Sequence, residues 1–158
     1  MAIILLPILS YAQEEKFEHH CFFEHKSLTV GVAAPYSLDL NTVGLNLRMY
    51  HNINEHICFG PEFSIFKRGE VEIVDFDFVV HYIFETPLVG IYPVLGVNYT
   101  IEQEMHPLEK ETRAETGLVY GIGMHRNVKS FTVFAEYSRV EWGIADQFIT
   151  LGLMYNIK

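Results

Sequence analysis

The sequence has no long apolar run and few basic residues. Its longest apolar stretch lies near the N-terminus, is interrupted by Pro7, and is shorter than the ~18 residues that a membrane-spanning helix needs. Lysine and arginine number 11 against 20 aspartates and glutamates, which argues against nucleic acid as a partner. With only two cysteines, Cys21 and Cys58, the chain can form at most one internal disulfide. If this protein meets a membrane, it must do so as a closed barrel.

Apolar residues are instead abundant and periodic. They make up 49% of the 158 residues, a length that corresponds to one domain. In the last stretch, 147–157, large apolar residues alternate with small or polar ones, which is the period of a β-strand. The same alternation predicts eight strands, at 26–34, 42–51, 56–66, 71–84, 88–100, 116–125, 129–139 and 147–157.

The N-terminal segment is typical of an exported protein. Residues 1–13 have a short apolar core followed by the small-x-small pattern Ser10-Tyr11-Ala12, although the usual basic start is missing. We therefore predict a signal peptide at 1–13, a polar periplasmic leader at 14–25 and a barrel domain at 26–158. After export a disulfide between the two cysteines is possible.

The leader also contains the metal candidates of the sequence. Their residue types suit zinc or copper, but their spacing matches no closed tetrahedral motif, so a solvated leader is the alternative. These candidates are His19, His20, Cys21 and His25. We expect no cofactor.

The composition of the polar face decides between two kinds of barrel. A soluble, lipocalin-like barrel carries charged residues outside and an apolar ligand inside. Here the polar face is largely Gly, Thr, Ser and Asn, while nearly every Lys and Arg falls in a loop, a turn or a strand end. This favours an all-β, eight-stranded antiparallel up-and-down transmembrane barrel, with the soluble barrel as the rival.

The connections between the strands differ in length. Tight turns are predicted around Ile53, Thr86 and Asn127, and the intervening connections are mostly longer, as in outer-membrane barrels. The longest are the polar loop at 101–115 and the loop at 140–146. Pro61 and Pro93 fall inside strands, where we expect bulges, with misassigned strand ends as the alternative.

Charged side chains on the polar face should face the lumen. Unpaired charges are costly there, so we expect them to form a salt-bridge and water network; a gated path for protons or small cations is the alternative. The predicted network consists of Arg48, Glu62, Asp75, Asp77, His81 and Glu136.

Aromatic residues near the strand ends predict two girdles at the membrane boundaries. The outer girdle comprises Tyr99, Tyr137 and Trp142, and the inner girdle comprises Phe84, Phe131 and Tyr155.

The final strand carries the sharpest local motif, Thr150-x-Gly152-x-x-Tyr155-x-Ile157. It resembles the signal that the barrel-insertion machinery reads, except that the chain ends in Lys158 rather than an aromatic residue. With this motif and the strand pattern of 26–157, the chain resembles the small eight-stranded outer-membrane barrels of the OmpA/OmpX-like group, in particular the outer-membrane β-barrel proteins of Bacteroidetes. The resemblance implies a monomer in the outer membrane of a Gram-negative bacterium, in contact with lipid and assembled by that machinery.

An enzymatic role has little support. Some small outer-membrane barrels act on lipid acyl chains through a Ser/His/acid set, for which the candidates here are His106 with Glu104 or Glu109, and Ser37 with Asp39. No Gly-x-Ser-x-Gly element is present. We therefore expect a structural, adhesive or loop-binding protein that is not an enzyme and that binds any extracellular ligand through 101–115 and 140–146.

Overall fold

The computed structural model describes residues 26–106, 109–144 and 146–157. In this part of the chain all the regular secondary structure is β-strand. It contains no helix that is long and apolar enough to cross a membrane. The strands are β1 (Leu28–Ser37), β2 (Thr42–Val43), β3 (Leu45–Asn52), β4 (Ile57–Arg68), β5 (Val71–Tyr82), β6 (Phe84–Glu85), β7 (Gly90–His106), β8 (Glu109–Val128), β9 (Phe131–Glu141) and β10 (Asp146–Ile157).

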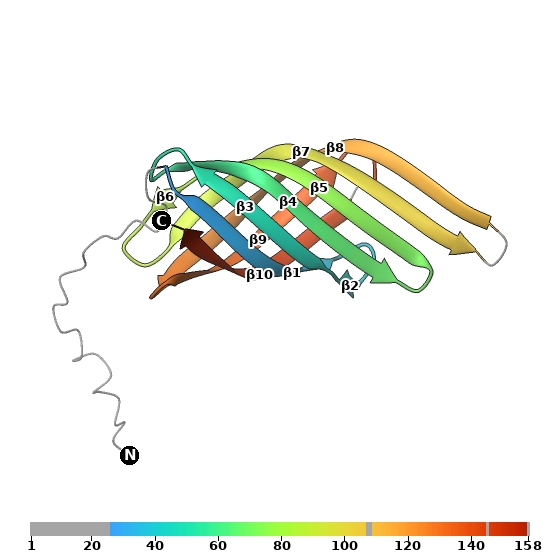
Figure 1. The fold of residues 1–158 in the computed structure, drawn as a ribbon, viewed down its shortest axis with the longest axis horizontal. Coiled ribbons are helices and arrows are strands. Elements are labelled where there is room, and N and C mark those ends of the chain that lie inside the picture. The colour runs from blue at the N-terminus through green and yellow to red at the C-terminus, as the bar shows by residue number, and fades with distance from the viewer. Residues whose placement is uncertain (1–25, 107–108, 145, 158) are drawn as a thin grey trace, which may run out of the picture.

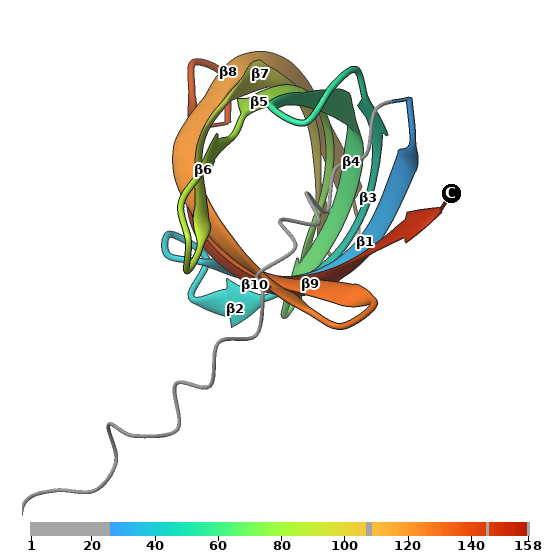
Figure 2. The same ribbon diagram turned by 90° about the vertical axis from the view of Figure 1, so that its left-hand side faces the viewer.

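The strands form one closed antiparallel barrel. Each long strand pairs with the next along the chain, and β10 returns to pair with β1, with Leu28 opposite Ile157 and Ser37 opposite Phe148. The closure is visible end-on in Figure 2. The two-residue strands β2 and β6 only prolong the pairing at the rims. The eight remaining strands confirm the predicted eight-stranded up-and-down barrel.

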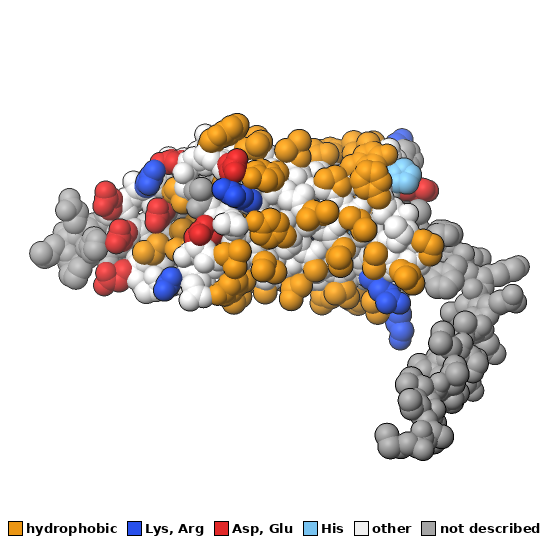
Figure 3. Space-filling model, turned by 180° about the vertical axis from the view of Figure 1, so that it is seen from behind, with side chains coloured by type: hydrophobic (Ala, Val, Ile, Leu, Met, Phe, Trp, Pro, Cys, Tyr) orange, Lys and Arg blue, Asp and Glu red, His pale blue; other side chains and the backbone are white. Residues whose placement is uncertain are grey.

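The outward side chains of the strands are mostly apolar, and the charged side chains in the middle of the strands point inward, together with apolar ones such as Phe66 and Phe134. Val97 and Leu151, for example, are 61% and 60% exposed, whereas Arg48 and Glu136 are buried inside. Orange side chains accordingly cover the middle of the outer surface in Figure 3. This is the reverse of a lipocalin-like barrel, so the rival reading with an apolar interior is wrong.

The two strand prolines sit in gaps of the ladder and not at bulges. The register of β4 against β5 runs through Pro61 without an extra residue, and that of β7 against β8 runs through Pro93. On its other side β4 pairs with β3 at Glu62 and again at Phe59, leaving Pro61 between the paired positions. Pro93 similarly falls between the pairing of β7 with β5 and its pairing with β6. The expected bulges are therefore wrong: each missing N–H falls where no ladder bond is made.

Some strand ends also differ from the prediction. The largest difference is in the segment 101–115, expected as a polar loop, where 101–106 and 109–115 form the ends of β7 and β8. Similarly β1 extends to Ser37, beyond the predicted strand 26–34. The predicted strand 71–84 is divided into β5 and β6.

The barrel has two unlike ends. At the end where β1 begins and β10 ends, which we call the termini end, the connections lie at 53–56, 86–89 and 129–130. At the opposite, distal end β7 and β8 continue well beyond β9 as a two-stranded ribbon (Figure 1), and β5 stays paired with β7 as far as Glu104. We call residues 101–115 of this ribbon the distal hairpin.

Candidate functional site

A charged cluster lies in the middle of the barrel interior, around Arg48 of β3. Its Nη2 lies 2.9 Å from Glu62 Oε2 on β4, and its Nη1 lies 3.4 Å from Glu136 Oε2 on β9. The Nε donates a hydrogen bond to Asn46 Oδ1 at 2.8 Å. All these side chains are buried, so one guanidinium links carboxylates from both sides of the ring.

Small residues make room for the large interior side chains. A Cβ on Gly31 would lie 2.9 Å from Arg48 Cγ, and one on Gly152 would lie 2.6 Å from the ring of Phe134. That ring lies under the guanidinium, 4.4 Å from its Cζ, in a cation–π contact. The small residues of the polar face therefore allow a filled interior.

Two tyrosines, neither of them part of the predicted network, complete the cluster. The hydroxyl of Tyr50 donates to Glu62 Oε1, and that of Tyr92 donates to Glu136 Oε2 at 3.2 Å. Each carboxylate therefore has a hydroxyl donor as well as Arg48. The signal was present in the sequence, because residues an even number of positions apart on a strand face the same side. Tyr50 is two residues from Arg48 on β3, and Tyr92 is four residues from Gly96 on β7, and both of these neighbours face inward.

The other predicted acids, Asp75 and Asp77, lie apart from Arg48 and are held by neutral donors. Asn98 Nδ2 donates to Asp77 Oδ1 at 2.7 Å, and the Thr100 hydroxyl donates to Asp75 Oδ1. Both donors come from β7, the neighbouring strand. These hydrogen bonds compensate part of the desolvation of the two carboxyl groups.

His81 lies nearer the termini end, in an aromatic layer. Its Nδ1 is 3.6 Å from Cys58 Sγ, and its ring packs against Tyr50 and Tyr92 with centroid distances of 4.9 and 4.8 Å. Cys58 is fully buried, and Cys21 lies outside the described residues, so their disulfide stays a prediction.

The interior is filled on both sides of the Arg48 cluster. Toward the distal end, the rings of Phe66 and Phe148 stack 5.2 Å apart. Between this stack and the cluster is a cavity of about 20 Å³, bordered by Arg48, Glu62 and Asp75. That volume suits about one water molecule. The geometry is that of a packed polar core.

The distal hairpin prolongs the barrel wall, and its β7 strand stays paired with β5 as far as Glu104 opposite Val71. It pairs from Ile101 opposite Ala114 to His106 opposite Glu109. By sequence it carries five glutamates against Lys110 and Arg113. Glu104 lies directly opposite Glu111, and like charges in that position destabilise a strand pair.

One edge of this hairpin lacks a strand neighbour. The pairing of β8 with β9 begins only at Leu118, so within the described chain residues 109–114 have no strand on that side. An edge of this kind offers N–H and C=O groups to an extended partner.

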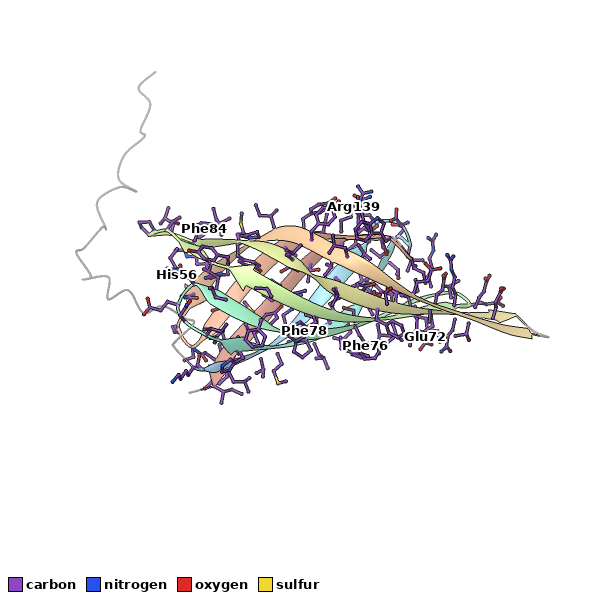
Figure 4. The ribbon with its side chains drawn as sticks, turned by 90° about the horizontal axis from the view of Figure 1, so that it is seen from above. His56, Glu72, Phe76, Phe78, Phe84 and Arg139 are labelled. Atoms are coloured by element: carbon purple, nitrogen blue, oxygen red, sulfur yellow. The ribbon has the colours of Figure 1, made fainter. Side chains whose placement is uncertain are left out.

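The aromatic side chains predicted to form girdles all point outward. Near the termini end, the rings of Phe131 and Tyr155 lie 5.6 Å apart, and Phe84 packs on Tyr82 (Figure 4 labels Phe84). Toward the distal end, the exposed fractions are 43% for Tyr99, 40% for Tyr137 and 71% for Trp142.

The residues of the predicted insertion signal divide between the two faces of β10. Tyr155 and Ile157 are exposed on the outside, whereas Thr150 is buried within the barrel and Gly152 is partly buried. The signal itself stays a prediction.

The catalytic and metal candidates do not form a site in the described residues. Ser37 is fully buried and donates a hydrogen bond to Asp146 Oδ2 at 2.5 Å, while Asp39 is exposed. The side chains of His106 and Glu109 and the four leader residues His19, His20, Cys21 and His25 lie outside the described part. In the part that is described, no group of three or more His, Cys, Asp or Glu side chains is placed to hold a metal ion.

Comparison with known proteins identifies the fold. No family model matches the chain, and no curated protein matches its sequence. Among solved structures, the N-terminal β-barrel domain of Pseudomonas aeruginosa OprF superposes with a TM-score of 0.73 at 12% identity, covering 84% of this chain and 98% of that one.

Two further structures agree. Ail, the attachment invasion locus protein of Yersinia pestis, gives a TM-score of 0.61 at 20% identity and covers 83% of this chain and 97% of its own. Neisserial surface protein A gives 0.60 at 14% identity, with coverages of 84% and 94%. Ail has also been crystallised with the heparin analogue sucrose octasulfate. The fold of this chain is therefore that of the small outer-membrane β-barrels.

Proposed function

We propose that this chain is a monomeric, non-enzymatic outer-membrane barrel of a Gram-negative bacterium that binds extracellular partners through its distal hairpin. The observation that carries the proposal is the contrast between a filled interior and a charged ribbon that projects beyond the apolar surface. A packed core of Arg48, Glu62 and Glu136 suits a scaffold better than a conducting pore. The OmpA/OmpX-like and Bacteroidetes resemblance of the sequence fits this role.

The orientation follows from the two ends. Outer-membrane barrels have short turns on the periplasmic side and longer loops outside. The termini end of this barrel, with its short turns, then faces the periplasm, where the leader 14–25 also lies. The distal hairpin stands outside the cell, and the apolar outer surface of Figure 3 contacts lipid.

The charge of the hairpin favours a basic partner. Glu104 and Glu111 lie directly opposite each other across the strands, so a cationic group placed there would be attracted by both carboxylates. A polyanion such as the sulfated sugar bound to Ail has the wrong sign for this surface. The open edge of 109–114 adds a place for main-chain pairing. The partner class that fits both features is an extended, basic protein segment.

A peptide-binding measurement tests this proposal. The purified barrel in detergent micelles is titrated with a short peptide that alternates lysine and threonine, with sucrose octasulfate as the anionic probe. The peptide should bind in a salt-dependent way and the sugar should not. The double variant Glu104→Gln/Glu111→Gln should lose roughly 2- to 30-fold in affinity, since each exposed charge pair contributes about 0.2–1 kcal/mol.

The matched control removes the same charge elsewhere. Glu55 and Glu85 both lie at the termini end, away from the hairpin. The variant Glu55→Gln/Glu85→Gln should bind the peptide like the wild type. Equal losses in the two variants would show that only net charge matters and would reject the hairpin as the binding surface.

A further inference from the structure

A groove of about 490 Å³ lies on the outward face of the barrel, toward the distal end. Its lining includes outward side chains of three neighbouring strands and the β9–β10 connection: Pro61 of β4, Phe76 and Phe78 of β5, Val97 and Tyr99 of β7, and Trp142. Figure 4 shows Phe76 and Phe78 pointing away from the barrel on β5. The short side chains Pro61 and Val97 lie opposite Phe78 on the two flanking strands, which leaves a depression between larger aromatic rings.

Trp142 borders this groove with an unusual backbone. Its φ is 65°, a region that residues with a Cβ rarely adopt, and Gly143 follows at 68°. The connection is fixed against β8: a Cβ on Gly117 would lie 2.9 Å from the carbonyl oxygen of Trp142, and one on Gly143 would lie 2.9 Å from that of Thr116. The packing therefore holds the only tryptophan of the chain, 71% exposed, beside the groove.

The surroundings of the groove define its occupant. The groove is continuous with the apolar outer surface, where Val97, Leu95 and Ile122 are more than half exposed. In a membrane, acyl chains surround this surface, while a tryptophan prefers the boundary between chains and headgroups. The volume of the groove also lies within the range of ~300–1,000 Å³ that is usual for ligand sites.

We propose that this groove seats one acyl chain of an outer-leaflet lipid, with the Trp142 indole packed beside the chain at the headgroup boundary. The inference rests on the proposed membrane location but not on binding by the distal hairpin. Phe76, Phe78 and Tyr99 form the aromatic walls, and Val97 leaves the space that the chain fills.

A matched pair of substitutions distinguishes the effect of filling this groove from the effect of adding a ring elsewhere on the outer surface. Val97→Phe fills the groove, whereas Val133→Phe adds the same atoms at an outward position of β9 that is 45% exposed and outside the groove. Both sites are exposed, so both variants should fold. The mobility shift on boiling in SDS checks this before any lipid is measured.

Lipid retention is then measured by native mass spectrometry of the barrel extracted from membranes in mild detergent. Wild type and Val133→Phe should each retain one lipid, and Val97→Phe should retain roughly tenfold less because the added ring excludes the chain. Equal retention in the two variants would overturn the proposal. A dimer mass that Val97→Phe abolishes would also overturn it, since a second barrel would then occupy the groove.

The single tryptophan provides an independent readout. In vesicles of phosphatidylcholine with brominated chains, Trp142 emission should be quenched more strongly in the wild type and Val133→Phe than in Val97→Phe. Quenching that is equal in all three would reject the groove while leaving the membrane location intact. A barrel that shows neither the mobility shift nor any association with vesicles would instead reject the proposed location.

Discussion

Replacing Arg48 with methionine removes the only cation that contacts both Glu62 and Glu136 in the described interior. The guanidinium lies 2.9 and 3.4 Å from the two carboxylates, and their side chains are 7% and 3% exposed. Removing one partner of a buried pair costs about 3–5 kcal/mol, because the remaining charge stays desolvated. We therefore expect Arg48→Met to lower the free energy of unfolding by at least about 3 kcal/mol, which is more than 100-fold in the folding equilibrium.

The assay is urea unfolding of the barrel in lipid vesicles, followed by the emission of Trp142. Arg139→Met is the matched control, because Arg139 pairs with Glu141 at the surface, where both side chains are at least 40% exposed. An exposed pair contributes about 0–1 kcal/mol. Figure 4 shows Arg139 on the outside of the barrel.

A third variant checks the cause of the loss. In Arg48→Met/Glu62→Gln/Glu136→Gln no buried charge remains in the cluster, so much of the stability should return. If Arg48→Met and Arg139→Met destabilise the barrel equally, the cluster is not a buried charge network and the reasoning fails. A triple variant less stable than Arg48→Met would also contradict it.

Three other predictions address separate parts of the molecule. Gly123→Ala places a Cβ 2.3 Å from the ring of Tyr92 and should cost about 1–3 kcal/mol in urea unfolding; an unchanged midpoint would contradict the inward position of that ring. Glu104→Gln/Glu111→Gln removes a like-charge pair and should stabilise the hairpin by about 0.2–1 kcal/mol, measured as slower amide exchange; faster exchange would refute the repulsion. Tyr155→Ala should slow assembly into the membrane of cells while leaving refolding in detergent unchanged, and normal assembly would reject the insertion signal.

Strand parity explains why the barrel and its two faces could be predicted. Each strand with one apolar side shows a strict alternation, and a shift by one residue would turn every side chain to the wrong face. Arg48, Glu62 and Glu136 share the inward parity of small residues such as Gly31 and Gly152, so their placement in the interior followed from the sequence.

The distal hairpin was missed because both of its faces meet solvent. Between Ile101 and Glu115 the described positions are exposed or partly exposed, so no apolar period marks the strands. Its pairing depends on backbone hydrogen bonds that continue from the barrel, with Tyr99 opposite Thr116 leading into Ile101 opposite Ala114. The alternation of side chains does not predict that backbone pairing continues beyond the apolar part of the two strands.

The part of the two tyrosines in the cluster and the regular strand geometry at the two prolines were not predicted, for different reasons. Tyr50 and Tyr92 are large aromatic residues, which composition assigns to the apolar face, yet parity places them inside, where their hydroxyls bind the carboxylates. Pro61 and Pro93 avoid bulges because the neighbouring strands leave gaps opposite them. Such gaps depend on which strands lie side by side, and this information is absent from any single strand.

The central claim, a closed barrel with its apolar face in a membrane, is tested most directly by gel mobility in SDS. Protein from the outer-membrane fraction is compared before and after boiling. The unbroken ring from β1 to β10 should resist SDS until heated, so the unboiled protein should migrate differently from the boiled one. Identical mobility, together with a protein that stays soluble without detergent, would contradict the account.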